Sequence, residues 1–157
     1  MEYQIDDLDK RILSFLMADS RMAYTEIAKE LLVSPGTIHV RMGKMEKAGI
    51  VEKATLKIDF HQLGYDVVAF MGVYLKGGGR YNEAIDELKA VPEVIEAHYT
   101  TGAYGLFIKI VCQNTEHLRA VLQEKIQPIE AIDKTETFIS LEAGIERSIS
   151  VFSGRSS

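Results

Sequence analysis

A cluster of basic and hydroxyl side chains stands out between residues 34 and 57. The whole chain of 157 residues carries a formal net charge of −5. Residues 34–57 instead hold five Lys or Arg side chains against two Glu, a local charge of +3. Guanidinium and ammonium groups bind phosphate oxygens and the acceptor edge of guanine. The expected chemistry of this stretch is therefore recognition of a nucleic acid by one basic face.

A second polar group occupies the short turn "TTGAYG", Thr100–Gly105. Gly102 can adopt φ > 0 and leave backbone amides open to a carboxylate. Thr100, Thr101 and the Tyr104 hydroxyl add donors and acceptors. The turn could therefore hold a small polar ligand. An ordinary hairpin with ordinary strand threonines has the same residues, and spacing alone favours that simpler interpretation.

Catalytic and metal chemistry have little support in the sequence. The four histidines, His39, His61, His98 and His117, show no metal-ligand spacing with Cys112. No nucleophile stands beside an evident base, and "GGGR" lacks the Lys-Ser/Thr of a phosphate-binding loop. We therefore expect no enzyme, no metal and no cofactor.

The compartment is suggested by cysteine usage and hydropathy. A single cysteine excludes an internal disulfide and fits a reducing environment. The acidic N-terminus has no apolar stretch long enough for a signal peptide. No segment approaches the ~20 apolar residues of a membrane span. The expected location is the cytoplasm, away from membranes.

The basic stretch lies in a region, up to about residue 60, whose apolar residues recur with helical spacing. Three short helices are predicted, the first capped by Asp6 or Asp7. Ser34 is a good N-cap for the third helix, and Pro35 fits its first position. The expected core residues are Leu8, Ile12, Phe15 and Leu16 of the first helix, Ile27, Ala28 and Leu31 of the second, and Ile38, Met42 and Met45 of the third.

The third helix should end at Ala48-Gly49, because glycine is common just after a helix. Residues 50–59 then alternate apolar and polar side chains, as a short strand or hairpin would. Three helices, a tight turn before the third and a following β-wing predict a winged helix-turn-helix.

This fold gives the basic row a function. With the apolar residues of the third helix in the core, we expect Thr37, Arg41 and Lys44 on the opposite side, entering the DNA major groove. Ser34 and Lys47 would lie near phosphates. A plain solvated face is the alternative interpretation. The candidate DNA-binding residues are Ser34, Thr37, His39, Arg41, Lys44 and Lys47.

From residue 61 the pattern changes to β-α-β-β-α-β. This order predicts a ferredoxin-like antiparallel sheet with both helices on one face, so the fold class is α+β. The other face would hold apolar residues such as Phe70 and, depending on register, Phe107 or Tyr104. An uncovered apolar face needs a partner, and self-pairing is the simplest solution. The predicted domains are residues 1–60 and 61–150, with a tail at 151–157.

Six segments taken together resemble the Lrp/AsnC ("feast/famine") family of transcriptional regulators. They are "IDDLDKRIL", "AYTEIAKEL", "VSPGTIHVRMGKMEKAGIV", "LGYDVVAF", "YTTGAYGLFIKI" and "IDKTETFISL". The resemblance covers residues 4–150, and "SPGTIHVR", "YTTG", "KIQ" and "TET" look nearer to the asparagine-responsive branch. It implies double-stranded DNA as partner and an amino-acid effector, with asparagine a candidate. It also implies homodimers and an octamer of four dimers.

The resemblance also implies which residues hold the effector. One chain would contribute the turn, and a neighbouring dimer would contribute a Gln and two Thr. Many family members carry an acidic residue in or just after the turn, suited to an α-ammonium group, where this chain has Ala103 and Gly105. Ala23 likewise replaces the usual Ser or Thr cap of the second helix. The candidate effector residues are Thr100, Thr101, Gly102, Ala103, Tyr104, Gln127, Thr135 and Thr137.

Two other functions fit parts of the sequence. A ferredoxin-like sheet can stack RNA bases on aromatic residues. Tyr104 and Phe107 are three residues apart, however, and are expected on opposite strand faces. An amino-acid-sensing regulatory subunit that does not bind DNA would explain the second domain alone, and the basic third helix argues against it.

Overall fold

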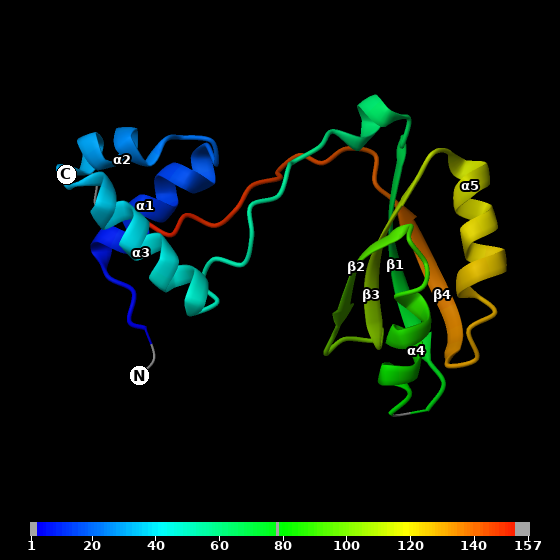
Figure 1. Ribbon diagram of the computed structural model, residues 1–157. Helices are drawn as coiled ribbons and strands as arrows, with labels where there is room; N and C mark the ends of the chain where they lie inside the picture. Colours follow the sequence, from blue (N-terminus) through cyan, green and yellow to red (C-terminus); the bar gives the residue numbers. More distant parts are fainter. Residues whose placement is uncertain (1–2, 78, 153–157) are drawn as a thin grey trace. The chain divides into compact units, whose positions relative to one another are not determined.

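The computed structural model describes residues 3–77 and 79–152 (Figure 1). The chain forms two compact units. One contains the chain up to Lys57 together with the segment that begins at Ile145, and the other spans Ile58–Gly144. Lys57 and Glu146 form an ion pair of 3.3 Å within the first unit. Residues 145–150, which were predicted to end the second domain, are grouped with the first unit by their contacts. Residues 153–157 of the predicted tail lie outside the described residues.

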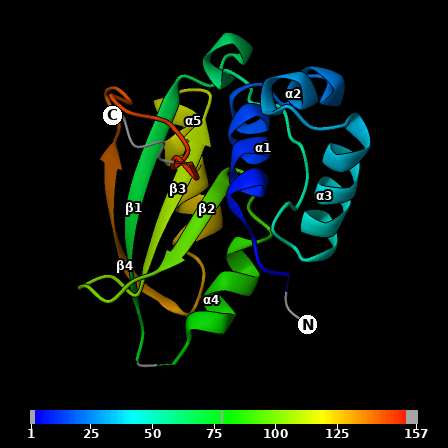
Figure 2. The ribbon, with the colours of Figure 1, turned by 90° about the vertical axis from the view of Figure 1, so that its left-hand side faces the viewer.

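The first unit contains the three predicted helices, α1 (Asp7–Ala18), α2 (Tyr24–Leu31) and α3 (Pro35–Lys47). Figure 2 shows α2 running steeply across the direction of α3, as in a helix-turn-helix. Only three residues separate these two helices. Because apolar side chains recur on one face of each helix, the three faces close around a single core. This core consists of Ile12, Ile27, Ala28, Leu31, Ile38, Met42 and Met45.

Side-chain caps fix where two of these helices begin. Asp6 caps α1 and accepts from the backbone N–H of Asp9, and the Asp9 carboxylate accepts from the N–H of Asp6 in return. Ser34 caps α3 by accepting from the Thr37 N–H at 3.1 Å, with Pro35 at the first helical position, as predicted. The α2 helix begins after Ala23 without a side-chain cap.

The predicted strand or hairpin at residues 50–59 is wrong. This segment forms no strand, and apart from Val51, which packs against the core, its large apolar residues are exposed, with Leu56 76% exposed. A strand needs a neighbouring backbone to satisfy its N–H and C=O groups, and an alternating pattern needs one buried face. In the described part of the chain, residues 50–59 pair with no strand.

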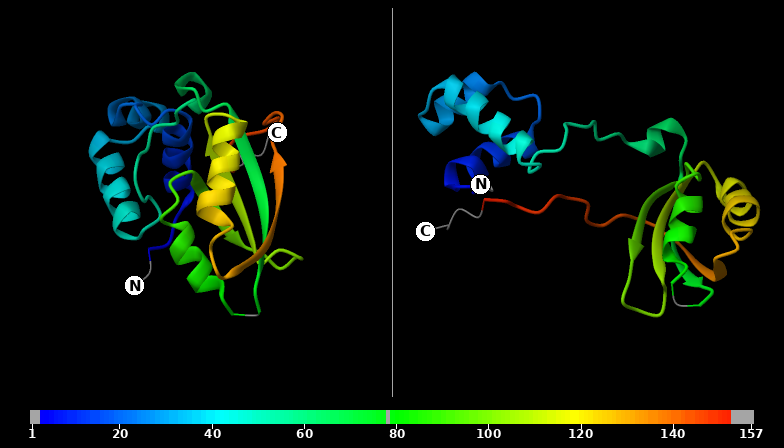
Figure 3. Two further views of the ribbon diagram at one scale, coloured as in Figure 1. Left: turned by 90° about the vertical axis from the view of Figure 1, so that its right-hand side faces the viewer. Right: turned by 60° about the horizontal axis from the view of Figure 1, so that its bottom comes forward.

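The second unit has the predicted β-α-β-β-α-β order. Its antiparallel sheet is arranged β2-β3-β1-β4. Figure 3 shows α4 and α5 on the same face of the sheet. After a short 3₁₀ turn at Phe60–Leu63, the elements are β1 (Val67–Leu75), α4 (Tyr81–Leu88), β2 (Val94–Tyr99), β3 (Leu106–Cys112), α5 (Thr115–Ala120) with its π-helical continuation Val121–Ile126, and β4 (Ile132–Ile139).

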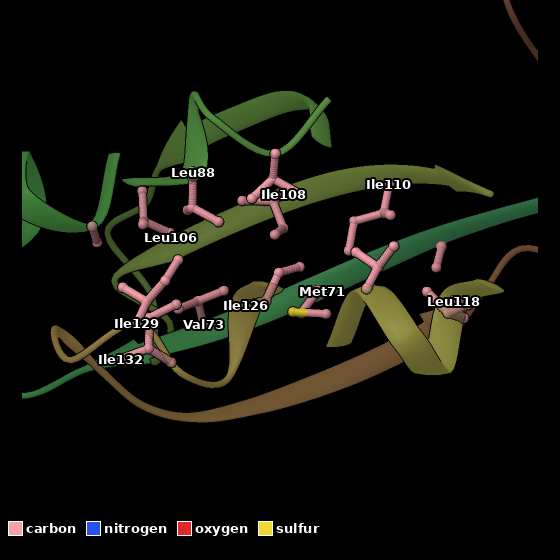
Figure 4. Close-up of a cluster of buried hydrophobic side chains, with 14 of the residues drawn as sticks. Met71, Val73, Leu88, Leu106, Ile108, Ile110, Leu118, Ile126, Ile129 and Ile132 are labelled. Carbon is pink, nitrogen blue, oxygen red and sulfur yellow. The ribbon is translucent and has the colours of Figure 1, made fainter. Parts of the chain in front are cut away.

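The core of the second unit lies between the sheet and its helices (Figure 4). Met71 and Val73 of β1 alternate with residues that face the other way, so every second side chain is buried. Leu88 of α4 and Ile126 after α5 pack onto them. The opposite face carries Phe70, whose ring stacks on Phe107 with centroids 6.1 Å apart.

Candidate nucleic-acid interface and effector site

The outer face of α3 is defined by what the helix buries. Ile38, Met42 and Met45 point into the core. At 3.6 residues per turn, the opposite side carries Gly36, Val40, Gly43 and Lys47, with His39 and Lys44 at its borders. Val40 is 58% exposed, and His39, Lys44 and Lys47 are exposed. We call these six residues the outer face of α3.

Two predicted DNA-binding residues lie elsewhere. Thr37 and Arg41 are half-buried at the edge of the packed side of α3. Each directly precedes a core residue and is rotated only about 100° from it. Thr37, Arg41 and Lys44 do form one row, but this row lies beside the core and not opposite it as predicted.

The contacts of these two side chains agree with that placement. The Thr37 hydroxyl lies 2.9 Å from the Ser34 hydroxyl. The Arg41 guanidinium turns back to α1 and donates to Asp6 at 2.5 Å and to Asp9 at 3.3 Å. Ser34, His39, Lys44 and Lys47 stay exposed, so four of the six candidates remain open to a partner.

Two glycines on this face were not recognised in the sequence. A Cβ at Gly43 would meet nothing within 4 Å, and one at Gly36 would make ordinary contact with the Ser34 hydroxyl at 3.7 Å. Packing within the unit thus requires neither glycine, although glycine inside a helix costs about 0.5–1 kcal/mol relative to alanine. Bare backbone beside Val40 lets a partner approach the helix closely. The sequence signal for this exposed backbone is "PGTIHVRMG", in which two glycines lie seven residues apart in a predicted helix.

The turn before α3 contains a strained residue, which leads to a stability prediction. Leu32 has φ 56° and is 93% exposed. A left-handed conformation is unfavourable for a residue with a Cβ, and this leucine buries little in return. Leu32→Gly should therefore raise the free energy of unfolding by about 1 kcal/mol. Thermal or urea unfolding measures the change.

Leu141 is the matched control for this prediction, because it is as exposed as Leu32 and does not have positive φ. Leu141→Gly should give no stabilisation. Equal effects of the two substitutions would contradict the strain argument.

The predicted effector turn is closed by a hydrogen bond from a side chain to its own backbone. The Thr100 hydroxyl donates to the Tyr104 carbonyl at 2.5 Å. Gly102 does not have positive φ, and a Cβ there would meet nothing within 4 Å. The expectation that Gly102 uses left-handed backbone is therefore wrong. Thr101, Gly102 and Ala103 are exposed at the tip.

Tyr104 joins this turn to the far strand of the sheet. A Cβ at Gly72 would lie 2.4 Å from its ring, so the glycine makes room for the tyrosine. The Tyr104 hydroxyl donates to Glu136 at 2.7 Å, and the Tyr74 hydroxyl donates to the same carboxylate at 3.1 Å. These two hydrogen bonds lower the pKa of Glu136, and the bond to Glu136 raises the pKa of Tyr104. A charged carboxylate thus lies beside a turn whose own sequence has none.

Tyr104 and Phe107 lie on the same side of the sheet, with ring centroids 6.0 Å apart. The expectation that they occupy opposite faces is wrong. Tyr104 precedes β3 and belongs to the turn, so strand alternation does not govern its direction.

Two of the three residues expected from a neighbouring dimer gather elsewhere, and Thr137 is not among them. A cavity of about 330 Å³ is lined by Gln127, Ile132, Asp133, Lys134 and Thr135. This volume is at the low end of the range for ligand pockets, about 300–1,000 Å³, and suits a small molecule. The cavity brings Gln127 and Thr135 together and adds a carboxylate and an ammonium group.

The two groups of effector candidates lie on opposite faces of the sheet. Thr135 and Thr137 pair with Val73 and Met71, which point toward the helices. Glu136 lies between them and pairs with Gly72, on the side where Tyr104 lies. Directly paired residues share a face. Within one chain, therefore, the turn and the threonines of β4 cannot line one site.

Other reactive groups offer little chemistry. Burial raises the pKa of the Cys112 thiol, which disfavours the reactive thiolate. The described residues contain no group of three or more His, Cys, Asp or Glu side chains arranged to hold a metal ion. Within the described ranges, no helix is both long and apolar enough to span a membrane.

Comparison with known proteins matches both units. A family model for winged helix-turn-helix DNA-binding domains matches residues 5–52, and the Lrp/AsnC ligand binding domain matches residues 68–149. The regulatory protein AsnC of Escherichia coli K12 is 49% identical over 147 residues, covering 94% of this chain and 97% of that protein. AsnC of Haemophilus influenzae is 46% identical, covering 94% and 98%.

Solved structures are similar to the chain as well. The structure of E. coli AsnC matches with a TM-score of 0.91 and 48% identity, covering 94% of this chain and 99% of that chain. A transcriptional regulator from Neisseria meningitidis, solved as an L-Met complex, matches with a TM-score of 0.88, covering 92% and 95%. At 16% identity, the second likeness concerns the fold alone.

Proposed function

The chain belongs to the Lrp/AsnC family and is a DNA-binding transcriptional regulator, and from this premise we propose that α3 reads double-stranded DNA while the second unit senses a small amino acid. The observation that carries the proposal is the outer face of α3, exposed and basic on a capped helix-turn-helix. We infer that the protein acts in the cytoplasm and catalyses no reaction.

The outer face of α3 supports a specific docking mode. Val40 lies at its centre with Gly36 and Gly43 on either side, so the helix backbone can approach the floor of the major groove. An apolar side chain at this position suits the methyl group of thymine. Lys44 then lies at the border of the face and Lys47 at its C-terminal end, where the groove presents phosphates, and His39 borders the base edges. Screening limits repulsion from the acidic remainder of the chain to about 8–10 Å.

We place the effector between two dimers. The turn would come from one chain, and the cavity at Gln127 and Thr135 from the other. The carboxylate of Asp133 suits an α-ammonium group, and exposed turn amides suit an α-carboxylate. The Gln127 amide can pair with a side-chain amide, so asparagine is the first candidate.

The assembly follows from the two faces of the sheet. Phe70, Phe107 and Phe138 form an aromatic patch on the face without helices, and Phe138 is 49% exposed. We propose that two chains pair through this patch, because a symmetric dimer covers it on both. A dimer presents two α3 helices to half-sites a whole number of helical turns apart. Effector contacts would join dimers into a ring, with four dimers as the proposed size.

The effector proposal gives a binding prediction. Asparagine at 100 times its dissociation constant should stabilise the wild type by about 2.7 kcal/mol. Gln127→Ala should weaken binding about tenfold or more, because the side-chain amide of the bound asparagine would lose its hydrogen-bond partner. Calorimetry and thermal shift with a panel of amino acids measure both effects.

Gln62→Ala serves as the control, since Gln62 is exposed on the 3₁₀ turn. It should bind asparagine like the wild type. A wild type that binds none of the amino acids tested would refute the effector proposal. Normal binding by Gln127→Ala would refute only the location of the site.

A further inference from the structure

A buried charge cluster at the start of α1 is not explained by DNA contact or effector binding. Asp9 is 0% exposed although it is a charged residue. Its carboxylate accepts hydrogen bonds from the Tyr3 hydroxyl at 2.9 Å and from the Asp6 backbone N–H at 3.1 Å. The Arg41 guanidinium lies 3.3 Å from both carboxylate oxygens. The cluster therefore joins the segment before α1, the first turn of α1 and the middle of α3.

Arg41 is held in this cluster because its departure would leave the buried carboxylate of Asp9 without a counter-ion. A carboxylate removed from water needs hydrogen bonds and a counter-ion. Within residues 3–77 and 79–152, Arg41 is the cation that forms an ion pair with Asp9. Arg41 also pairs with Asp6, and its side chain is only 28% exposed. Moving the guanidinium to a DNA phosphate would leave Asp9 buried without its counter-ion.

Hydrogen bonding in the cluster is reflected in the acid–base properties of its members. The hydrogen bond that Arg41 donates to Asp6 raises the pKa of Arg41 above its usual range. The Asp9 backbone N–H, and then Arg41, lower the pKa of Asp6. Burial, and then the bond to Asp9, raise the pKa of Tyr3. Each shift keeps the group in the protonation state that the cluster uses near neutral pH.

We propose that Arg41 is a positioning residue, which fixes the rotation of α3 about its axis and so directs the outer face of α3 at DNA. Arg41 immediately follows Val40 and lies one turn before Lys44 on the same helix. A guanidinium held at two carboxylates resists both rotation and sliding of the helix that carries it. The proposal deepens the DNA-binding function and assigns Arg41 no contact with DNA.

The positioning role and a direct DNA contact by Arg41 predict opposite changes in DNA affinity for one substitution. Asp9→Asn removes a negative charge from the DNA-binding unit. If only electrostatic attraction mattered, DNA binding would stay the same or become tighter. If the cluster positions α3, DNA binding should become weaker, because Arg41 loses its buried partner.

The test uses the full chain, its own upstream DNA and a random duplex of equal length, with anisotropy measured over a series of salt concentrations. Arg41→Ala and Asp9→Asn should each lower specific affinity about tenfold or more, the cost of losing a base contact. Affinity for random DNA should stay near the wild-type value. The salt slope, which is the slope of log affinity against log salt concentration, should also stay near the wild-type value. Asp7→Asn, an exposed neighbour with the same charge change, should bind at least as well as wild type.

A different outcome would overturn the proposal. A direct phosphate contact by Arg41 predicts that Arg41→Ala reduces the salt slope by about 0.9, while Asp9→Asn binds normally or more tightly. If the buried substitutions prevent folding, Asp6→Asn replaces them, because asparagine is as good an N-cap as aspartate. That variant should also lose specific affinity with an unchanged salt slope, and wild-type affinity in a folded Asp6→Asn protein would refute the positioning role.

Discussion

Reversing the charge of both Lys44 and Lys47 to Glu should reduce affinity for the protein's own upstream DNA by about 100-fold or more. Both side chains are exposed on the outer face of α3 and make no ion pair with another described residue, so the protein should still fold. Glu in the last turn of the helix opposes its dipole and should cost only about 0.3–1 kcal/mol at each position. Each lysine can neutralise one phosphate, and each contact with a charged group contributes about 1.5–3 kcal/mol. The reversal also adds two repelling carboxylates.

The control reverses Lys76 and Lys89, which are exposed in the second unit; Lys89 pairs with Asp86 at 2.8 Å, but exposed pairs of this kind contribute little to stability. It makes the same change in net charge away from the helix-turn-helix, so it should bind DNA nearly as well as wild type. The salt slope of the Lys44/Lys47 variant should fall by about 0.9 for each lost phosphate contact. Equal losses in both variants would mean that net charge, and not α3, governs binding. Preferential binding of RNA of equal length by the wild type would instead favour the RNA-binding alternative.

Phe107→Asp should convert the proposed dimer into a monomer. Phe107 lies on the sheet face without helices and stacks on Phe70, so the core on the other face is not disturbed. Symmetry places two copies of the change in one interface. Losing burial of each phenylalanine costs about 1.5–3 kcal/mol, and two copies weaken dimerisation about 100-fold or more. Two unpaired carboxylates near each other add repulsion.

Light scattering after size-exclusion chromatography measures this effect. Phe60→Asp is the control, because Phe60 is exposed on the 3₁₀ turn and should leave the dimer intact. A wild type that stays monomeric at all concentrations would refute the pairing of sheets. A dimer that forms no larger assembly, with or without amino acids, would refute only the proposed ring of dimers.

The sequence was sufficient to predict the elements whose signals are local. Ser34 and Pro35 are adjacent, and a cap with a proline at the first position marks a helix start in almost any context. Core spacing on α3 likewise appears within two turns, so Ile38, Met42 and Met45 were predicted as buried and are. The order of strands and helices in the second unit follows from hydrophobic periodicity, and the structure confirms it. Residues 50–59 show the limit of such local signals. Their apolar and polar residues alternate, but a strand does not form without a neighbouring backbone to pair with.

Tertiary structure alone decided what the charged residues contact. Arg41 looked like a free basic residue, and only the packing of α3 on α1 brings it to Asp9, 32 positions away in the chain. Glu136 seemed unrelated to the effector turn until sheet register placed it opposite Gly72, within reach of Tyr104. Periodicity along one segment fixes which face of that segment is buried. The partner of a long polar side chain depends on the angle and register between segments, which arise only when their apolar faces pack together.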